Sequence, residues 1–378
     1  MKPFIAAFAA VTLSAGLANA QDFTLPQQLA WTAYDTGSAG YNQAVAVGAA
    51  LQDAAGINLR VLPGKNDVSR TEPLRQGRVQ FSATGVGGSF MAQEGAFDFG
   101  AENWGPQPVR VLLANNGGAI NLAVGVAADA GIETFADLKG KRVAFIVGAP
   151  ALNVNTEAYL AYGGLTWDAV PRVDFGGFGA SWTGLIEGQV DAAFAATNSG
   201  NAYEAAAGPR GLFWPPIDPD DAESLAAMHS VAPFFLPNLA TVGANIDGTD
   251  GYQGAGYPYP VLVATDETDE DLVYNMTKAM VELFPAYDGK APGIGGWALE
   301  LQEMEWVVPY HDGTIRYFTE VGVWSDAAQA NNDRLIERQA VLKAAWDALK
   351  AEGASDWEAA WAEARRAALA DNGFEVVF

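Results

Sequence analysis

The chain of 378 residues carries a formal charge of −24, is half hydrophobic and contains no cysteine. So acidic a protein is a poor partner for nucleic acid or anionic membrane surfaces, and without cysteine it forms no disulfide, thiol nucleophile or thiolate metal site. Its length suffices for two hydrophobic cores, since a single core stops growing near about 250–300 residues.

The first 20 residues have the organisation of a secretory signal peptide. Lys2 supplies the positive charge, residues 3–17 are an apolar run, and Ala18-Asn19-Ala20 is a small-x-small cleavage site. The apolar run is too short to serve as a membrane-spanning anchor. We therefore expect cleavage after Ala20 and an exported, soluble mature protein.

Three predicted strands follow, and each runs into a turn of small polar residues. The strands cover 29–34, 57–62 and 79–83, and the turns cover 35–40, 64–69 and 84–88. Small residues predict a helix over 41–55, and a short helix over 72–76 ends at Gly77. Ligands of open α/β sheets sit in turns at the carboxyl ends of strands, so the repetition indicates a binding cleft.

After two further predicted strands, at 109–114 and 121–127, the stretch 142–164 reads RVAFIVGAPALNVNTEAYLAYGG. Its first part is β-branched and aromatic, as in a buried strand, and a Gly-Ala-Pro turn then leads into a helix. Thr134 caps a single helical turn before it. A strand, a short turn and a helix leave unpaired backbone N–H groups at the helix start, which suits an anion.

The pattern repeats once more before the chain returns. We predict a strand over 173–175, a loop over 176–179 and a helix over 181–187. A strand over 190–195 then ends in a polar turn over 196–199. Residues from about 125 to 250 therefore form a second domain. A helix over 218–228, a Gly- and Tyr-rich loop over 248–260 and a strand over 261–264 lead back to the first domain, where an amphipathic helix covers 268–284.

The last part of the sequence is helical. Residues 326–350 carry Leu335, Leu342 and Leu349 in a 4-3 stripe, and the Ser355 to Glu358 capping box opens a second helix that runs to about residue 371. So short a stripe is typical of a helix packed on its own domain, with a coiled-coil partner as the alternative.

No motif assembles a catalytic set. The two histidines, His229 and His311, lie far apart in the sequence, and Ser181 lacks the second glycine of a nucleophile elbow. There is no phosphate-binding Gly-Lys-Ser/Thr loop, and the acidic clusters lack the offsets of a calcium loop. We therefore expect no enzymatic activity, no metal and no cofactor.

The chain resembles the TAXI-type solute-binding proteins of tripartite ATP-independent periplasmic (TRAP) transporters over nearly all of its mature length. The resemblance rests on TGSAGYNQAVAVGAAL (36–51), GIETFADLKGKRV (131–143), the turn within 142–164, GLIEGQVDAAF (184–194) and VPYHDGTIRYFTEVGVW (308–324). It implies an α/β fold of the two-lobed, type II-like periplasmic binding protein class, with hinge strands and a C-terminal helical extension. Lobe 1 then comprises 21–124 and 261–325, lobe 2 comprises 125–260, and residues 326–378 form helices packed on lobe 1.

The resemblance also implies a function. A small carboxylate-containing organic solute is captured between the lobes in the periplasm and delivered to the membrane subunits of a TRAP transporter, by a protein that we expect to be a monomer. Closure is driven by the higher affinity of the ligand for the closed state. An exported enzyme and a sensory binding protein without a transport role remain alternatives on the same fold. An extracellular adhesion or structural protein is a further alternative, and contact of the C-terminal helices with the membrane subunits stays open.

The candidate ligand-binding residues are carried over from the family turns. Those with polar or small side chains are Ser38, Tyr41, Asn66, Ser69, Thr84, Gly85, Asn153, Asn155, Thr197 and Asn198. Each of them can alternatively be a turn former that satisfies its own backbone. Asn66 and Ser69 stand where the family reads Gly-Ser-x-x-Asn, but in an altered order.

The turn within 142–164 departs from the family pattern. The family usually has Gly-Ser-Gly-Thr where this chain has Ala151-Leu152-Asn153-Val154. Leu152 brings an apolar group to an anion position, and Phe178 and Trp182 follow in the next unit. If these side chains face the cleft, the ligand is a carboxylate compound that is bulkier or less polar than glutamate-like ligands.

Overall fold

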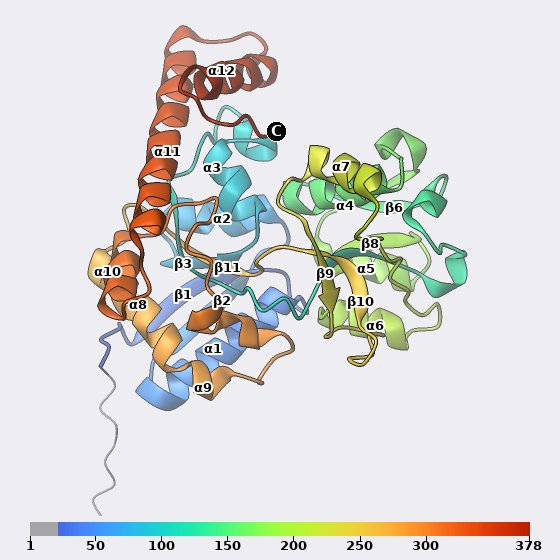
Figure 1. Cartoon of the computed structure of the whole chain (residues 1–378), viewed down its shortest axis with the longest axis horizontal. Helices are drawn as coiled ribbons and strands as arrows, with labels where there is room; N and C mark the ends of the chain where they lie inside the picture. The colour runs from blue at the N-terminus through green and yellow to red at the C-terminus, as the bar shows by residue number, and fades with distance from the viewer. Residues whose placement is uncertain (1–21) are drawn as a thin grey trace, which may run out of the picture.

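The structure, a computed structural model, describes residues 22–378. The predicted signal peptide lies outside these residues. The described chain forms two α/β lobes side by side and a pair of C-terminal helices that rises along the first lobe (Figure 1). No helix of residues 22–378 is both long and apolar enough to cross a membrane.

Lobe 1 is built on a five-stranded sheet with the order β2-β1-β3-β11-β4. Strand β1 pairs in parallel with β2 and β3, and β11 runs antiparallel to β3 and β4. The strands are β1 (Gln28–Ala33), β2 (Asn58–Pro63), β3 (Phe81–Thr84), β4 (Val109–Ala114) and β11 (Val261–Thr265). The α-helices are α1 (Ala39–Ala55), α2 (Asp67–Arg75), α3 (Ala92–Glu94), α8 (Glu270–Glu282), α9 (Phe284–Tyr287) and α10 (Asp312–Glu320).

Lobe 2 holds a four-stranded sheet with the order β5-β8-β6-β7 and a separate pair, β9 and β10. Its strands are β5 (Leu122–Val126), β6 (Val143–Ile146), β7 (Arg172–Phe175), β8 (Ala192–Ala196), β9 (Leu236–Ala240) and β10 (Tyr252–Gly256). Its α-helices are α4 (Pro150–Tyr162), α5 (Phe178–Ile186), α6 (Gly200–Ala207) and α7 (Ala222–Val231). Strand β8, inside this sheet, and strand β5, at its edge, are buried throughout, as expected where both faces of a sheet are covered.

Short single-turn helices complete both lobes. A π-helical turn, η1 (Gly87–Met91), follows β3, and the 3-10 turns are η2 (Phe97–Gly100), η3 (Ala128–Ala130), η4 (Phe135–Leu138), η5 (Trp167–Ala169), η6 (Ile294–Trp297) and η7 (Leu299–Leu301). The turn predicted to be capped by Thr134 is η4, where Thr134 and Asp137 form a reciprocal capping box.

Two connections join the lobes, and buried asparagines fix the ends of the first one. Asn115 Nδ2 donates to Gln43 Oε1 (3.0 Å) and Gly293 O (2.8 Å) in lobe 1. Asn121 Nδ2 donates to the carbonyls of Asn238 (2.9 Å) and Tyr252 (3.1 Å) in lobe 2. A change in the angle between the lobes therefore falls on the residues between these asparagines and on the second connection, residues 257–260.

The C-terminal helices α11 (Asp326–Glu352) and α12 (Trp357–Asp371) contact lobe 1 around one buried carboxylate. Glu94 is fully buried and accepts from Arg338 Nε (2.7 Å) and Arg365 Nη1 (3.0 Å). Trp361 Nε1 donates to Gly95 O (2.6 Å). A buried carboxylate needs such partners, because an unpaired buried charge costs several kcal/mol, roughly 3–5.

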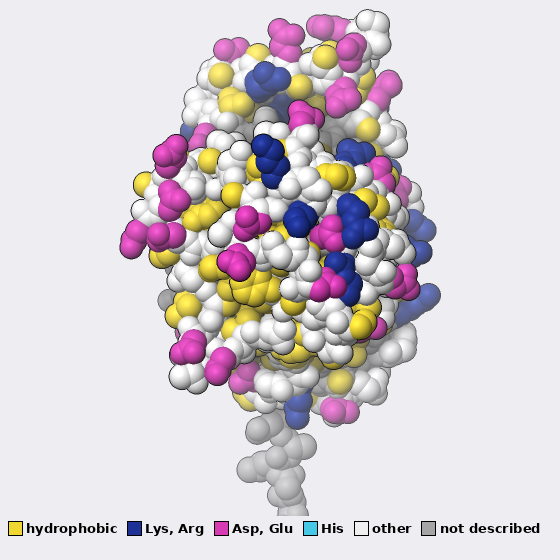
Figure 2. Space-filling model, turned by 90° about the vertical axis from the view of Figure 1, so that its right-hand side faces the viewer, with side chains coloured by type: hydrophobic (Ala, Val, Ile, Leu, Met, Phe, Trp, Pro, Cys, Tyr) yellow, Lys and Arg dark blue, Asp and Glu magenta, His cyan; other side chains and the backbone are white. Residues whose placement is uncertain are grey.

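The face of lobe 2 that is turned away from lobe 1 carries acidic and basic side chains around a patch of hydrophobic ones (Figure 2). The net negative charge is therefore not gathered on this face. This mixture of signs is typical of a solvated surface.

The two-lobed α/β fold with a C-terminal helical extension is confirmed, and several local predictions were wrong. The polar loop predicted over 64–69 contains the start of α2, because Asn66 and Ser69 cap that helix reciprocally. The loop predicted over 248–260 contains β10, which pairs with the unpredicted strand β9. Helix α6 was also missed. The cap of α12 is Asp356, whose side chain accepts from Ala359 N, and not Ser355.

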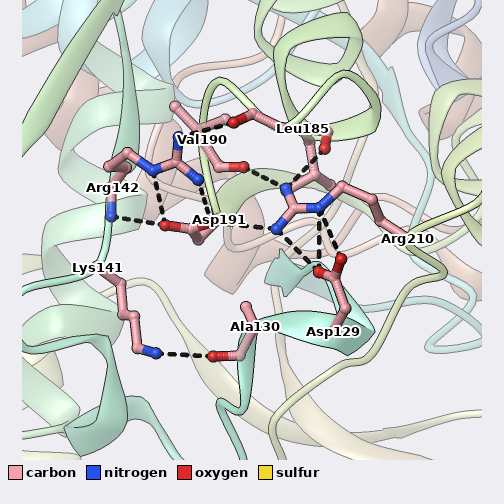
Figure 3. Close-up of polar contacts among 9 residues, drawn as sticks. Asp129, Ala130, Lys141, Arg142, Leu185, Val190, Asp191 and Arg210 are labelled. Atoms are coloured by element: carbon pink, nitrogen blue, oxygen red, sulfur yellow. Dashed lines mark hydrogen bonds and ion pairs between the residues drawn. The ribbon is translucent and has the colours of Figure 1, made fainter.

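A polar network holds the lobe-2 sheet at the end remote from lobe 1 (Figure 3). Asp191 lies just before β8, and Arg142 lies just before β6. The Asp191 carboxylate accepts from Arg142 Nη2 (2.6 Å) and Nε (3.0 Å) and from Arg210 Nη2 (3.2 Å). Lys141 Nζ donates to Ala130 O (2.7 Å). Burial raises the pKa of Asp191, but the hydrogen bonds from the two arginines outweigh burial and leave the pKa below its ordinary value.

We expect Asp191→Asn to lower the free energy of unfolding by about 2 kcal/mol, because Arg210 then loses a charged partner in a largely buried position. Urea unfolding followed by circular dichroism measures the change. Asp174→Asn is the control, because the Asp174–Arg172 pair is half exposed and its loss is expected to matter little. Equal losses in both variants would contradict the role given to the network.

His311 links α10 to the loop before α8. Its Nδ1 accepts from Gly313 N (3.1 Å), and its Nε2 lies 3.0 Å from Thr268 O, so one neutral tautomer satisfies both contacts. Burial lowers the pKa of His311 and prevails over the hydrogen bond to Thr268 and the nearby carboxylates, which act in the opposite direction. The folded state therefore favours the neutral ring.

Because the pKa of His311 is lower in the folded chain, the unfolded chain takes up the proton first as the pH falls. The stability that the neutral ring provides is complete above the unfolded pKa of about 6.5 and is lost as the pH falls toward the folded pKa. We expect His311→Asn, which does not titrate, to lose less stability than wild type between pH 7.5 and pH 5 in urea unfolding. An identical pH dependence in both proteins would rule out this role.

Candidate functional site

A small cavity lies where the two lobes and the second connection meet. Its volume is about 20 Å³, which is room for about one water molecule. Its wall is formed by Tyr34, Ser38, Leu122, Ala151, Leu152, Asn155, Phe178, Phe194, Ala195, Ala196, Ser199, Tyr257 and Tyr259. Because both lobes contribute to the wall, an organic solute enters only when the lobes separate.

Three phenol groups give the cavity its polar chemistry. The rings of Tyr34 and Tyr259 pack edge to face, with centroids 5.1 Å apart. Burial raises the pKa of Tyr34, Tyr257 and Tyr259, so their hydroxyls stay protonated and serve as neutral hydrogen-bonding groups. The rings of Phe178 and Phe194 make the lobe-2 side of the wall apolar.

Asn155 offers an unused hydrogen-bonding atom at the cavity. It is fully buried in α4, and its Nδ2 donates to the Tyr257 hydroxyl (2.7 Å). Its Oδ1 has no partner. Whichever way the amide is turned, one of its polar atoms has no partner in the protein and is available to a solute. Leaving a buried polar atom unpaired costs about 1–3 kcal/mol of folding free energy.

A buried ion pair lies behind the cavity wall, in α2. Asp67 and Arg70 form a salt bridge, and each side chain is 1% exposed. Arg70 stacks on the Tyr34 ring, with 3.6 Å from Cζ to the ring centroid, and its Nε donates to Thr84 Oγ1 (3.1 Å). Within residues 22–378 no lysine or arginine lines the cavity itself, so Arg70 is the cation that stands behind its wall.

Hydrogen bonds from the starts of lobe-2 helices to lobe 1 hold the cleft shut. Ala151 N of α4 donates to Asp67 Oδ2 (2.9 Å), and Gly179 N of α5 donates to Asp35 Oδ2 (3.1 Å). Gly200 N of α6 donates to the carbonyl of Gly37 (2.8 Å). The core of lobe 2 also continues across the closed cleft into buried residues of lobe 1, among them Val86 and Met91.

Four of the predicted binding residues line the cavity: Ser38, Leu152, Asn155 and Phe178. Ser38 also caps α1 by accepting from Tyr41 N (3.2 Å). Asn66 and Ser69 lie at the edge of the cleft, where Asn66 Nδ2 donates to Val147 O of lobe 2 (3.0 Å). The Thr84 hydroxyl accepts from Arg70. Gly85 lies so close to Tyr34 that a Cβ at this position would be 2.4 Å from the Tyr34 hydroxyl.

The other predicted residues do not line the cavity, and four of them form hydrogen bonds elsewhere in the protein, although Asn198 Oδ1 has no partner. Asn153 bonds both backbone groups of Ile146 (2.9 Å each), and Trp182 Nε1 donates to Phe194 O (3.1 Å). Thr197 Oγ1 donates to Val242 O (2.9 Å), and Asn198 Nδ2 donates across the cleft to Pro292 O (2.6 Å). Tyr41 is half-buried against the lobe-1 core.

Sequence reasoning missed most of the wall. Tyr257 and Tyr259 stood in a predicted loop, and Tyr34 was taken as the end of a strand. Asp67 stood in the polar loop predicted over 64–69, and Arg70 directly follows that loop. Their Asp-x-x-Arg spacing is the i,i+3 spacing of a helical ion pair and was the available signal. Among residues 22–378 no group of three or more acidic, histidine or cysteine side chains is placed to hold a metal ion.

Comparison with known sequences places most of the chain in one family. Residues 33–322 match the NMT1-like family. This span ends before α11, so the C-terminal helices lie outside it. No curated protein matches the sequence.

Solved structures of binding proteins are similar to the chain at low sequence identity. A mutant of ArgBP from T. maritima is 14% identical over 72% of this chain and 95% of its own, with a TM-score of 0.43. The alkanesulfonate-binding protein SsuA from Xanthomonas axonopodis pv. citri, bound to MOPS, is 15% identical over 87% of this chain and 94% of its own, with a TM-score of 0.40. At this level of similarity neither protein bears on which ligand this chain takes.

The close contact between Gly85 and Tyr34 gives a direct test of the wall. We expect Gly85→Ala to lower the free energy of unfolding by about 1–3 kcal/mol, because its Cβ would meet the Tyr34 hydroxyl at 2.4 Å and displace the ring. Gly176→Ala is the control, since a Cβ there meets no atom within 4 Å. Thermal unfolding measures both, and a neutral Gly85→Ala would show that Tyr34 is free to move.

Proposed function

The chain belongs to the NMT1-like family, and we propose that it is the extracytoplasmic solute-binding subunit of a TAXI-type TRAP transporter. One observation carries the proposal most directly: a cavity whose wall is shared by both lobes and by the connection between them. Such a cavity couples occupancy to lobe closure, because a solute contacts both halves of the wall only when the lobes meet. The membrane subunits then distinguish a loaded, closed protein from an open one.

The proposed ligand is a small organic carboxylate with an apolar part. Leu152, Phe178 and Phe194 give an apolar wall on the lobe-2 side. The three phenols and Asn155 supply neutral hydrogen bonds, and Arg70 supplies a positive charge behind Tyr34. Recognition of an apolar body by a few well-placed polar groups is the usual design of a small-molecule site.

The same geometry weighs against the enzymatic alternative. The hydroxyls at the cavity are protonated phenols and those of Ser38, which caps α1, and Ser199, and neither histidine lines the wall. An exported enzyme would need an activated nucleophile or a general base there. A sensory binding protein would use the same closure without a transporter.

The remaining predictions belong to this proposal. The N-terminal signal peptide, with cleavage after Ala20, would place the mature protein in the periplasm. The predicted division into lobe 1 (21–124 and 261–325), lobe 2 (125–260) and C-terminal helices (326–378) is supported by the sheets, since strands of different lobes do not share a sheet. A monomer remains our expectation.

A thermal-shift panel of amino, dicarboxylic and aromatic acids tests the proposed ligand class. An acid present at 100 times its Kd adds about 2.7 kcal/mol to the stability of the folded state, which corresponds to a rise in Tm of roughly 4 °C for a chain of this size. We expect this rise with aromatic or other bulky acids. A response to glutamate or small dicarboxylates alone contradicts the ligand class, and no response to any acid contradicts the proposed function.

Leu152→Asn provides the matched variant. It replaces an apolar wall residue by a polar one of similar size, so the rise in Tm with aromatic acids should fall by more than half while the response to small polar acids is kept. An unchanged response to aromatic acids would place their apolar part elsewhere.

A further inference from the structure

The lobe-2 helices that begin at the cleft lack caps of their own. No side chain of the residues preceding α4, α5 and α6 (Ala149, Gly177 and Ser199) bonds the first turn of its helix. The first backbone N–H groups of a helix have no partner within it and carry its partial positive charge. In this structure lobe 1 supplies the missing acceptors, two of which are the carboxylates of Asp35 and Asp67.

Asp67 is the more deeply placed of the two carboxylates. One of its oxygens pairs with Arg70, and the other accepts from Ala151 N of α4 at 2.9 Å. Its side chain is 1% exposed. The Asp67 carboxylate also lies against Gly87, since a Cβ there would come within 2.4 Å of its Cγ. A carboxylate is thus held by a guanidinium on one side and a helix start on the other, which is the donor set that recognises a bound carboxylate.

This carboxylate position adjoins the cavity on two sides. Ala151, whose N–H Asp67 accepts, is part of the wall, and so is Tyr34, on which Arg70 stacks. Asn155, one helical turn after Ala151, lines the cavity with a polar atom that has no partner. A solute lying in a widened cavity would therefore reach Ala151 N and Arg70 if Asp67 moved aside.

We propose that Arg70 and Ala151 N form the carboxylate subsite of the interlobe cleft, and that Asp67 occupies this subsite when no solute is bound. This inference rests on the proposed function and deepens it. The empty protein closes on its own side chain, and an incoming carboxylate must replace Asp67 on both partners. Asp67 thereby sets a threshold that the solute must exceed, since only a ligand that bonds the closed state better than Asp67 shifts the equilibrium.

The test measures lobe closure without any solute. The chain has no cysteine, so Asp53→Cys in lobe 1 and Asp168→Cys in lobe 2, both at exposed positions, allow two spin labels to be attached to the mature protein. The distance between the labels, measured by pulsed electron paramagnetic resonance, reports closure. We expect the empty wild-type protein to show mainly the short distance, and Asp67→Ala to lower the ratio of closed to open protein roughly tenfold.

The decisive measurement adds acetate to Asp67→Ala, because acetate restores the carboxylate that this substitution removes. Added sodium acetate should return Asp67→Ala to the short distance, whereas sodium chloride of the same ionic strength should not. Asp67→Asn should open partly and should not respond to acetate, because its amide still fills the position. An Asp67→Ala protein that stays closed, or that ignores acetate, overturns the proposal.

Two control variants separate the loss of the Asp67 carboxylate from a general disturbance of α2. Glu72→Ala removes a carboxylate with the same i,i+3 spacing to an arginine in the same helix. The Glu72 carboxylate is partly exposed and bonds only Arg75 and Gln76 at the end of α2, so closure should not change. Asp67→Ala combined with Arg70→Gln removes the unpaired charge, so it folds even if Asp67→Ala alone does not, and its closure should not respond to acetate. A response there would place the acetate elsewhere and overturn the proposal.

The experiment separates this inference from the proposed function. Closure that depends on Asp67 and is restored by acetate supports the subsite even if no acid in the panel raises the Tm of wild type, in which case the proposed function fails alone. Stabilisation of wild type by an acid, together with closure that is indifferent to Asp67→Ala, sinks the inference and leaves the proposed function standing.

Discussion

Closure of this protein depends on how three helices of lobe 2 satisfy their first backbone N–H groups. Helices α4, α5 and α6 start at the cleft without a capping side chain from their own segment. When the lobes meet, Asp67, Asp35 and the carbonyl of Gly37 take up these N–H groups. When the lobes part, water must do so. The position of one lobe is therefore coupled to the hydrogen bonding of the other.

A coupling of this kind suits a protein whose lobes have to separate again. Each bond across the cleft replaces a bond to water, so the net gain per bond is small, about 1 kcal/mol, and a few groups decide which state prevails. The asparagines at the ends of the first connection belong to their own lobes, so the lobes move as units. A solute that adds bonds in the closed state shifts this balance. The cavity between the closed lobes has a volume of about 20 Å³.

The sequence predicted the architecture well because architecture is repetitive. Apolar strands followed by small polar turns recur in both lobes, and the buried strands β6 and β8 fell within their predicted ranges or one residue beyond. The wall of the cleft was much harder to predict. Tyr257 and Tyr259 directly follow β10, which pairs with β9, and both of these strands carry weak strand signals in the sequence. Polar residues such as Asn153 and Thr197 were plausible ligands from their turns, yet their partners are backbone groups of segments brought near by the fold. Local pattern cannot tell a cap from a ligand-binding group.

The most direct test of the proposed closure is a crystal structure of the mature protein grown with the carboxylic acid that stabilises it most. We expect density for that acid in the interlobe cleft, with its carboxylate between Arg70 and Ala151 N, its apolar part against Leu152 and Phe178, and Asp67 displaced. Density for the acid on another surface, with Asp67 still bonded to Ala151 N and the cavity unchanged, would contradict this mechanism.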